Sequence, residues 1–143
     1  YEIARLSGGM PGWALNAITS PVVLEELDRV LGTIESVVRN GTVERFAYAA
    51  NLASSFWHDR TSVHQELAVW LIWWRDVLLA KEGVHRLLTH QSRMETFQAV
   101  ADSLSSAQVA AAIKAVRDTM HYLDRNINPR LALEELILAL PRP

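Results

Sequence analysis

The side chains best suited to chemistry in this 143-residue sequence include five histidines, but their spacing does not bring them together. They are His58, His64, His85, His90 and His121. A zinc-binding helix needs two histidines four residues apart, or histidine combined with cysteine, and the sequence offers neither. The lack of cysteine also excludes disulfides and thiolate nucleophiles. We therefore expect no metal site and no cofactor.

The carboxylates are also poorly placed for catalysis. Glu25-Glu26 and Glu134-Glu135 are adjacent pairs, and neighbours on a helix point in different directions rather than toward one substrate. Glu25 is instead expected to form a surface ion pair with Arg29, four residues along the helix. The sequence contains neither a nucleophile elbow nor a phosphate-binding glycine loop. It therefore predicts a chain without catalytic residues, not an enzyme.

Three tryptophans stand at i, i+3 and i+4 in an apolar run from 67 to 74. This spacing places Trp70, Trp73 and Trp74 on one face of a helix, where tryptophans mostly fill a core. Trp73 or Trp74 could instead reach the surface and anchor another protein, because tryptophan is common in binding hot spots. A helical regulatory module that binds a small apolar ligand among Trp57, Trp70 and Trp74 is a further alternative.

Composition and charge narrow the functional classes. Half of the residues are apolar and the net charge is −2, with the basic residues spread along the chain. This pattern argues against direct binding to DNA, which depends on concentrated positive charge. The apolar run from 67 to 74 is too short to cross a membrane, which takes about 20 residues. We expect a cytoplasmic protein, and the start at Tyr1 indicates a piece of a longer chain.

Capping signals divide the chain into about six helices from Ser20 onward. Gly41 and Gly83 are expected to end helices, because glycine readily adopts the left-handed conformation found there. The expected starts are Ser20-Pro21, Thr42, the capping boxes Ser62–Gln65 and Ser105–Gln108, and Asn128-Pro129. The sequence predicts an all-α antiparallel or orthogonal bundle. Residues 20–143 would form this domain, and residues 1–19 would be the short helical tail of a preceding one.

Apolar spacing predicts which face of each helix is buried. We expect four inward-facing groups of residues: Phe46, Ala50, Ala53 and Trp57; Met94, Phe97, Ala101 and Leu104; Val109, Ile113, Val116, Met120 and Leu123; and Leu131, Leu133, Leu136, Ile137 and Leu140.

Two stretches of this sequence resemble a known family. Ala4-Arg5-Leu6-Ser7-Gly8-Gly9-Met10-Pro11-Gly12-Trp13-Ala14-Leu15 is similar to the segment that leads into the sensor 2 helix in the lid of AAA+ clamp-loader subunits. Asn126-Ile127-Asn128-Pro129-Arg130-Leu131-Ala132-Leu133-Glu134 is similar to the last helix of their collar domain. The resemblance is greatest to the delta prime type of bacterial DNA polymerase III.

The resemblance implies a role for residues near the start of the chain. Gly8, Gly9, Pro11, Gly12 and Trp13 would form the sensor 2-like segment. ATP-hydrolysing relatives carry an arginine at the position of Gly12, where its charge stabilises the transferring phosphate. The resemblance therefore implies a lid that does not sense ATP. An arginine finger or a phosphate-binding loop would lie upstream of Tyr1.

The resemblance also implies a function for the helical domain. It would be a non-catalytic part of the DNA polymerase III clamp loader that joins the collar domains of the gamma/tau and delta subunits during sliding-clamp loading. Contacts with DNA would be indirect, and no small-molecule ligand is expected. Trp73, Trp74, Asn128 and Arg130 are the candidate interface residues, although Arg130 could pair with Glu134 instead. The collar of the gamma/tau ATPase is the alternative.

Overall fold

The computed structural model describes residues 21–143, which form six α-helices and two short 3-10 helices, with no strand in this range. The elements are α3 (Pro21–Arg39), α4 (Thr42–Phe56), α5 (Arg60–Lys81), η1 (His85–Leu87), η2 (Gln91–Arg93), α6 (Met94–Ser103), α7 (Ser106–Asp124) and α8 (Pro129–Ala139). The prediction of an all-α bundle is confirmed. The expected domain boundary and the sensor 2-like residues Gly8, Gly9, Pro11, Gly12 and Trp13 lie outside the described residues.

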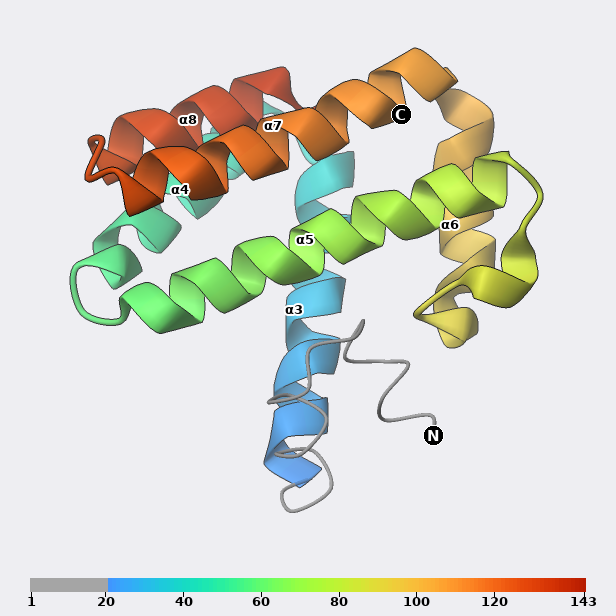
Figure 1. Cartoon of the computed structure of the whole chain (residues 1–143), viewed down its shortest axis with the longest axis horizontal. Coiled ribbons are helices and arrows are strands. Elements are labelled where there is room, and N and C mark those ends of the chain that lie inside the picture. The colour runs from blue at the N-terminus through green and yellow to red at the C-terminus, as the bar shows by residue number, and fades with distance from the viewer. Residues whose placement is uncertain (1–20) are drawn as a thin grey trace.

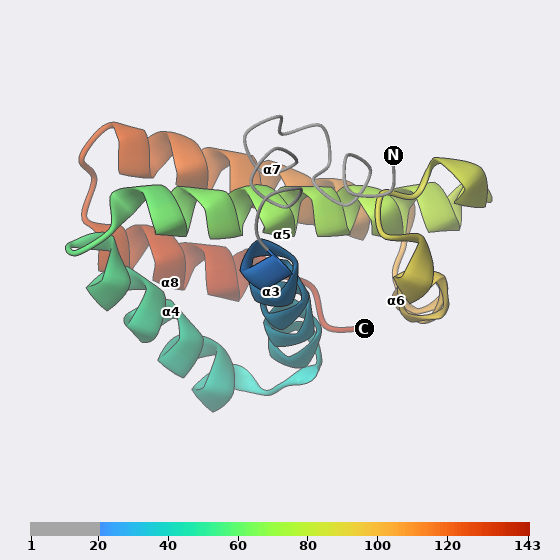
Figure 2. The ribbon, with the colours of Figure 1, turned by 90° about the horizontal axis from the view of Figure 1, so that it is seen from below.

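Helix α5 is the centre of the bundle and contacts α3, α4, α6 and α7. Helices α7 and α8 run along it, whereas α3 and α6 cross it steeply (Figures 1 and 2). Its tryptophans Trp70, Trp73 and Trp74 are fully buried. A helix that is apolar on several sides must be covered on several sides, which explains its central position. None of the helices in residues 21–143 is long and apolar enough to span a membrane.

The apolar seam predicted for α7 is confirmed. Val109, Val116 and Leu123 are fully buried, and Ile113 and Met120 pack partly buried against the same core. Their spacing of four and three residues keeps them on the side that faces α5.

The buried face of α4 differs from the prediction by one residue. The structure buries Arg45, Ala49, Leu52, Ala53 and Phe56. Of the face predicted from Phe46 to Trp57, only Ala53 is fully buried, and Trp57 is 73% exposed. The prediction failed because it counted only apolar residues, whereas Arg45 occupies a core position.

Arg45 is buried because its guanidinium group joins two helix ends. It donates hydrogen bonds to the carbonyls of Val37 (3.1 Å) and Val38 (2.8 Å) near the end of α3. It also donates to the carbonyls of Leu140 (2.9 Å) and Pro141 (3.0 Å) beyond the end of α8. Carbonyls at a helix C-terminus lack intrahelical partners and carry partial negative charge. Arg45 therefore satisfies both ends at once, although burial lowers the pKa of its guanidinium.

The predicted caps are partly confirmed. Ser105 and Gln108 form the expected capping box, and the side chain of Asn128 caps α8 with Pro129 at its first position. Gly83 follows the end of α5 with a φ of 74°, as expected for a glycine stop. Helix α4 does begin at Thr42 as predicted, but the capping residues of α4 and α5 were predicted wrongly. Asp59 caps α5 in place of Ser62, and α4 begins after Gly41 without a side-chain cap.

Three further details correct the sequence predictions. Leu131 is 55% exposed and Met94 is 38% exposed, because each lies at the edge of an otherwise buried helix face. Arg29 pairs with Glu26, three residues away, and not with Glu25.

Candidate functional site

The start of α8 presents the interface candidates Asn128 and Arg130 at the surface. The Asn128 carboxamide oxygen accepts from the backbone N–H groups of Arg130 (3.0 Å) and Leu131 (3.2 Å), so this side chain is occupied by capping. The Arg130 Nε lies 3.0 Å from a carboxylate oxygen of Glu134, which confirms the alternative ion pair. This pair is exposed and therefore weak, so Arg130 can exchange Glu134 for another acidic group.

The turn before α8 is fixed to the start of α5. Asn126 adopts a φ of 57°, a left-handed conformation that asparagine tolerates better than most residues. Its side-chain oxygen accepts a hydrogen bond of 2.9 Å from Arg60. Arg60 also lies 4.6 Å from the centre of the Phe56 ring, a cation–π distance. These contacts hold the ends of α4 and α7 and the starts of α5 and α8 together.

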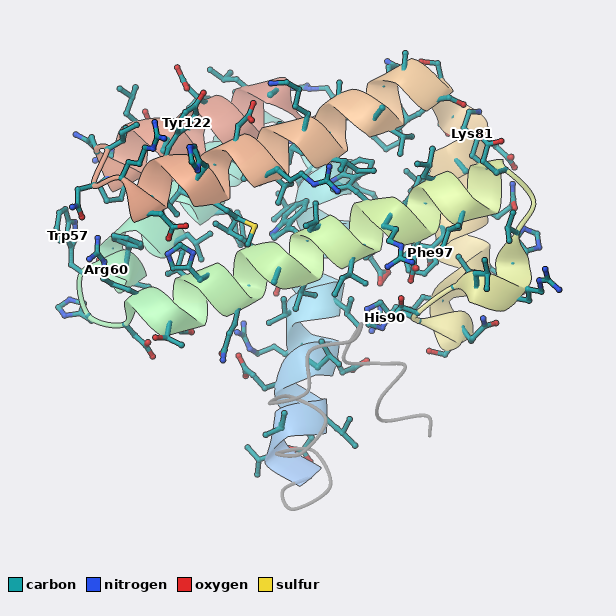
Figure 3. All side chains as sticks on the ribbon, viewed as in Figure 1. Trp57, Arg60, Lys81, His90, Phe97 and Tyr122 are labelled. Carbon is teal, nitrogen blue, oxygen red and sulfur yellow. The ribbon has the colours of Figure 1, made fainter. Side chains whose placement is uncertain are left out.

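Trp57 is the exposed tryptophan at this end of the bundle. It follows α4 directly, and its ring lies 6.1 Å from that of Phe56 in an edge-on arrangement. Figure 3 shows Trp57 and Arg60 at the same end of the molecule. Its exposure was not predicted, because the predicted α4 face was displaced by one residue. Recognising Arg45 as a core residue would have placed Trp57 at the surface.

Trp73 and Trp74 cannot serve as surface anchors on this fold. Both are fully buried, with ring centres 5.0 Å apart in an edge-to-face arrangement. The ring of Trp73 also packs 5.7 Å from that of Phe97 on α6. The expectation that one of these indoles is exposed was wrong, because α6 and α7 both pack against α5.

A groove of about 410 Å³ runs between α7 and α8. Ala115, Asp118 and Tyr122 line it from α7, and Glu135, Leu138 and Ala139 line it from α8. Leu138 is 68% exposed, and the groove is open to solvent. No sequence signal pointed to this groove, because it depends on how the two helices pack.

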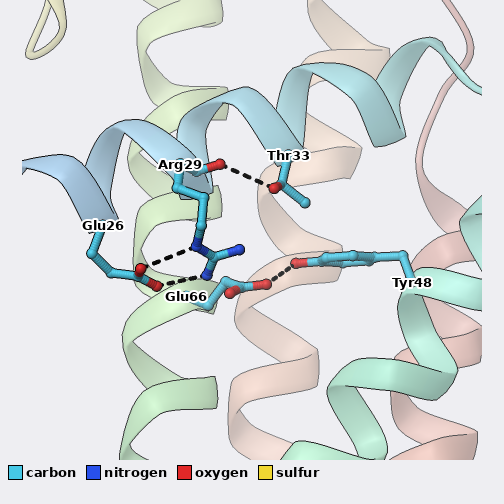
Figure 4. A network of polar contacts seen from close by, with 5 residues as sticks. All are labelled: Glu26, Arg29, Thr33, Tyr48 and Glu66. Atoms are coloured by element: carbon cyan, nitrogen blue, oxygen red, sulfur yellow. Dashed lines mark hydrogen bonds and ion pairs between the residues drawn. The ribbon is translucent and has the colours of Figure 1, made fainter.

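Polar side chains of α3, α4 and α5 gather in one region of the bundle (Figure 4). The hydroxyl of the partly buried Tyr48 donates to the Glu66 carboxylate and accepts from the indole N–H of Trp70 at 2.8 Å. Burial raises the pKa of Tyr48 well above its ordinary value, and Glu66 raises it further. Arg29 lies nearby, bonded to Glu26 at 2.6 and 3.0 Å. The hydrogen bonds of Tyr48 connect α4 to α5.

A second polar cluster anchors η1 and η2 to the core. The fully buried Asp76 carboxylate accepts from the backbone N–H groups of Thr89 and His90, both at 2.9 Å. Burial raises the pKa of Asp76, and the two N–H donors oppose that rise. Arg93 pairs with Asp28 (2.6 Å) and Glu35, which ties this segment to α3.

His90 is the least satisfied polar residue of the cluster. It is 1% exposed, and neither ring nitrogen has a hydrogen-bond partner among the described residues. Burial lowers its pKa to about 4, with a smaller contribution from the charge of Arg93. Within residues 21–143 no three histidine, aspartate or glutamate side chains converge to hold a metal ion. His90 is therefore a neutral imidazole packed in the fold at neutral pH.

A family comparison gives the context of this helical domain. A family model described as "DNA polymerase III, delta subunit, C terminal" matches residues 45–141, which is more than half of the chain. The chain belongs to this family. The matched region begins at Arg45 and ends at Pro141, and a partly buried hydrogen bond joins these two residues. Comparisons with curated proteins and with solved structures found no match.

Membership of this family makes the helical domain a clamp-loader region of DNA polymerase III. The family is a non-catalytic component of the clamp loader and implies contact with other clamp-loader subunits. The surface of the helical bundle, and not a catalytic cleft, is thus the place to look for function. The end of the bundle with Trp57 and Arg130 and the α7–α8 groove are its two most distinctive exposed features.

Proposed function

We propose that this domain mediates assembly of the clamp loader and supports sliding-clamp loading without catalysing a reaction. The observation that carries the proposal is the family match over residues 45–141, which supply most of the residues of the hydrophobic core. Its partners would be the collar domains of the gamma/tau and delta-type subunits, and its contact with DNA would be indirect. The domain would begin near Ser20, since α3 already contributes Leu27, Val30 and Ile34 to the core.

The finer proposal is that the chain comes from a subunit of the delta prime type. Its support is the resemblance of residues 4–15 to a delta prime lid, with Gly12 in place of the phosphate-sensing arginine. The same glycine disfavours the collar of the gamma/tau ATPase. The matched family carries the name of the delta subunit, so delta itself is the competing assignment. Reconstitution with either delta or delta prime omitted tests the assignment, because this chain should complete only the complex that lacks its own type.

Trp57, Asn128 and Arg130 are the proposed contact residues at the end of the bundle. Tryptophan and arginine are among the residue types most enriched in binding hot spots, and Trp57 is exposed without a covering helix in the described chain. Asn128 would contribute by holding the start of α8 in place. Trp73 and Trp74 would not contact a partner; they would contribute only by packing in the core that supports the contact residues.

The test is direct association with the other clamp-loader subunits. The full chain should elute with them in size-exclusion chromatography at about 50 µM, where a complex with a micromolar Kd would form. Trp57→Ala and Arg130→Ala should weaken association, whereas Arg86→Ala, an exposed residue on η1, should leave it unchanged. Absence of any wild-type association at this concentration would refute the assembly function.

A further inference from the structure

Small residues and an exposed leucine line the α7–α8 groove. Ala115 and Ala139 line it from opposite helices, and their short side chains leave room between the two backbones. The hydroxyl of Thr119 already donates a hydrogen bond of 2.8 Å to the carbonyl of Ala115, so its proton is not available to a ligand in the groove. Leu138 extends from the rim into solvent. The groove is therefore a recess with exposed apolar surface, and no other part of the described chain covers it.

Helix α8 continues the apolar rim beyond the groove. Leu131 is 55% exposed and Leu138 is 68% exposed, and seven residues separate them. Seven residues are close to two helical turns, so the two leucines lie on one face about 10 Å apart. This spacing matches the apolar positions of a helix that packs alongside another helix. A partner helix that lies along α8 can thus contact both leucines at once.

The charge of the groove selects the chemistry of the partner. Asp118 and Glu135 line it from opposite helices, and none of the described lining residues is basic. Asp118 has an ion pair with Lys114 at 2.6 Å, but the Lys114 side chain is 77% exposed. Such an exposed pair contributes little and is easily exchanged. Glu135 is exposed and has no ion pair within residues 21–143. The groove thus has two carboxylates ready to meet positive charge.

We propose that the α7–α8 groove binds an amphipathic helix of another clamp-loader subunit, with aliphatic residues at helical spacing flanked by lysine or arginine. The aliphatic residues pack on Ala115, Ala139 and Leu138, and the basic residues pair with Asp118 and Glu135. This inference rests on the proposed assembly function and adds the surface and the chemistry of the partner. Eight residues line the groove, fewer than the roughly 20 to 30 that each partner contributes to a stable interface, so it acts as one of several contacts in the complex.

Site-specific crosslinking identifies the occupant. The chain has no cysteine, so Leu138→Cys introduces a single attachment point for a benzophenone photo-crosslinker. Val43→Cys is the matched control, since Val43 is 79% exposed on α4 and does not line the groove. In the reconstituted complex, the probe at position 138 should crosslink to a basic helical segment of another subunit. A crosslink to a second copy of this chain, to a non-helical segment, or to nothing would overturn the proposal.

Binding measurements complete the test. The double variant Glu135→Lys/Leu138→Ser should weaken binding to the remaining subunits by about tenfold or more, as expected for loss of a charge pair and an apolar contact. The matched control Glu44→Lys/Val43→Ser makes the same kind of change on α4 and should stay within about twofold. Both substituted pairs are exposed, and thermal melting checks that each variant is folded.

The outcomes separate the two proposals. If the wild-type chain assembles and the groove variant assembles equally well, the groove inference is wrong and the assembly function stands. If the wild-type chain fails to associate at all, both are wrong. A groove variant that binds weakly while the α4 control binds normally supports both.

Discussion

The two sides of the core differ in how completely their buried nitrogens are hydrogen-bonded. On the α4–α8 side, the buried guanidinium of Arg45 makes four hydrogen bonds to carbonyls at two helix ends. On the side formed by α5, α6 and the two 3-10 helices, four buried nitrogens lack partners within the described residues. They belong to Trp73, Trp74 and His90. A satisfied buried polar group fixes geometry, whereas an unsatisfied one costs stability. The α4–α8 side should therefore be the more rigidly specified half.

Removing the guanidinium of Arg45 should lower the free energy of unfolding more than any other change considered below. Arg45→Met keeps much of the aliphatic volume but removes the guanidinium donor from four carbonyls, of which that of Val37 keeps the N–H of Asn40 as a second donor. We expect the free energy of unfolding to fall by about 3 to 5 kcal/mol. Urea denaturation measures it, with Arg39→Met, an exposed arginine at the end of α3, as the control. A loss below about 1 kcal/mol would show that water replaces the guanidinium easily.

Protonation of His90 should lower the stability of the side formed by α5, α6 and the two 3-10 helices. Its pKa is about 4 in the folded chain and 6.5 in the reference state, so the unfolded chain binds more protons between these values. Stability should therefore fall as the pH drops from about 6.5 toward 4, by at most about 3 kcal/mol. Denaturation at several pH values measures the slope. His90→Gln should flatten it, and His58→Gln at an exposed site should not; an unchanged slope in His90→Gln would contradict this assignment.

Loss of the Asp76 carboxylate should have a smaller and more local effect. Asp76→Ala removes the acceptor for the N–H groups of Thr89 and His90, but it also removes a buried charge that is costly to desolvate. We expect a loss of about 2 kcal/mol, together with faster hydrogen exchange from Val84 to Arg93. Asp102→Ala on the exposed face of α6 is the control. Uniformly faster exchange across α4 and α8 would mean that the two sides are not separable.

Much of the fold was predictable because its signals are local. The capping box of Ser105 and Gln108, the Asn128 cap and the seam from Val109 to Leu123 all depend on residues within one helix, and the structure confirms them. The α4 face was missed because burial of Arg45 depends on carbonyls about 95 residues away in the chain. Sequence spacing within one helix contains no information about such a distant partner.

The candidate site was less predictable than the fold. Asn128 and Arg130 were predicted as contact residues from the resemblance of residues 126–134 to a collar helix, and this stays a prediction; the exposure of Trp57 was missed together with the α4 face. The groove forms only when α7 and α8 pack together. It is acidic because this packing places Asp118 and Glu135, which are 17 residues apart in the sequence, along the same groove. Buried polar groups and interhelical surfaces are thus where the tertiary structure adds most to the sequence.

The position of Arg45 also bears on how force passes through the domain. A pull along α8 reaches α3 through the hydrogen bonds of one guanidinium, without first passing through the central helix α5. Helices α3 and α8 are thereby coupled mechanically although they are farthest apart along the described chain. If neighbouring subunits bind α8 while the complex changes shape, the hydrogen bonds of Arg45 transmit the displacement of α8 to α3.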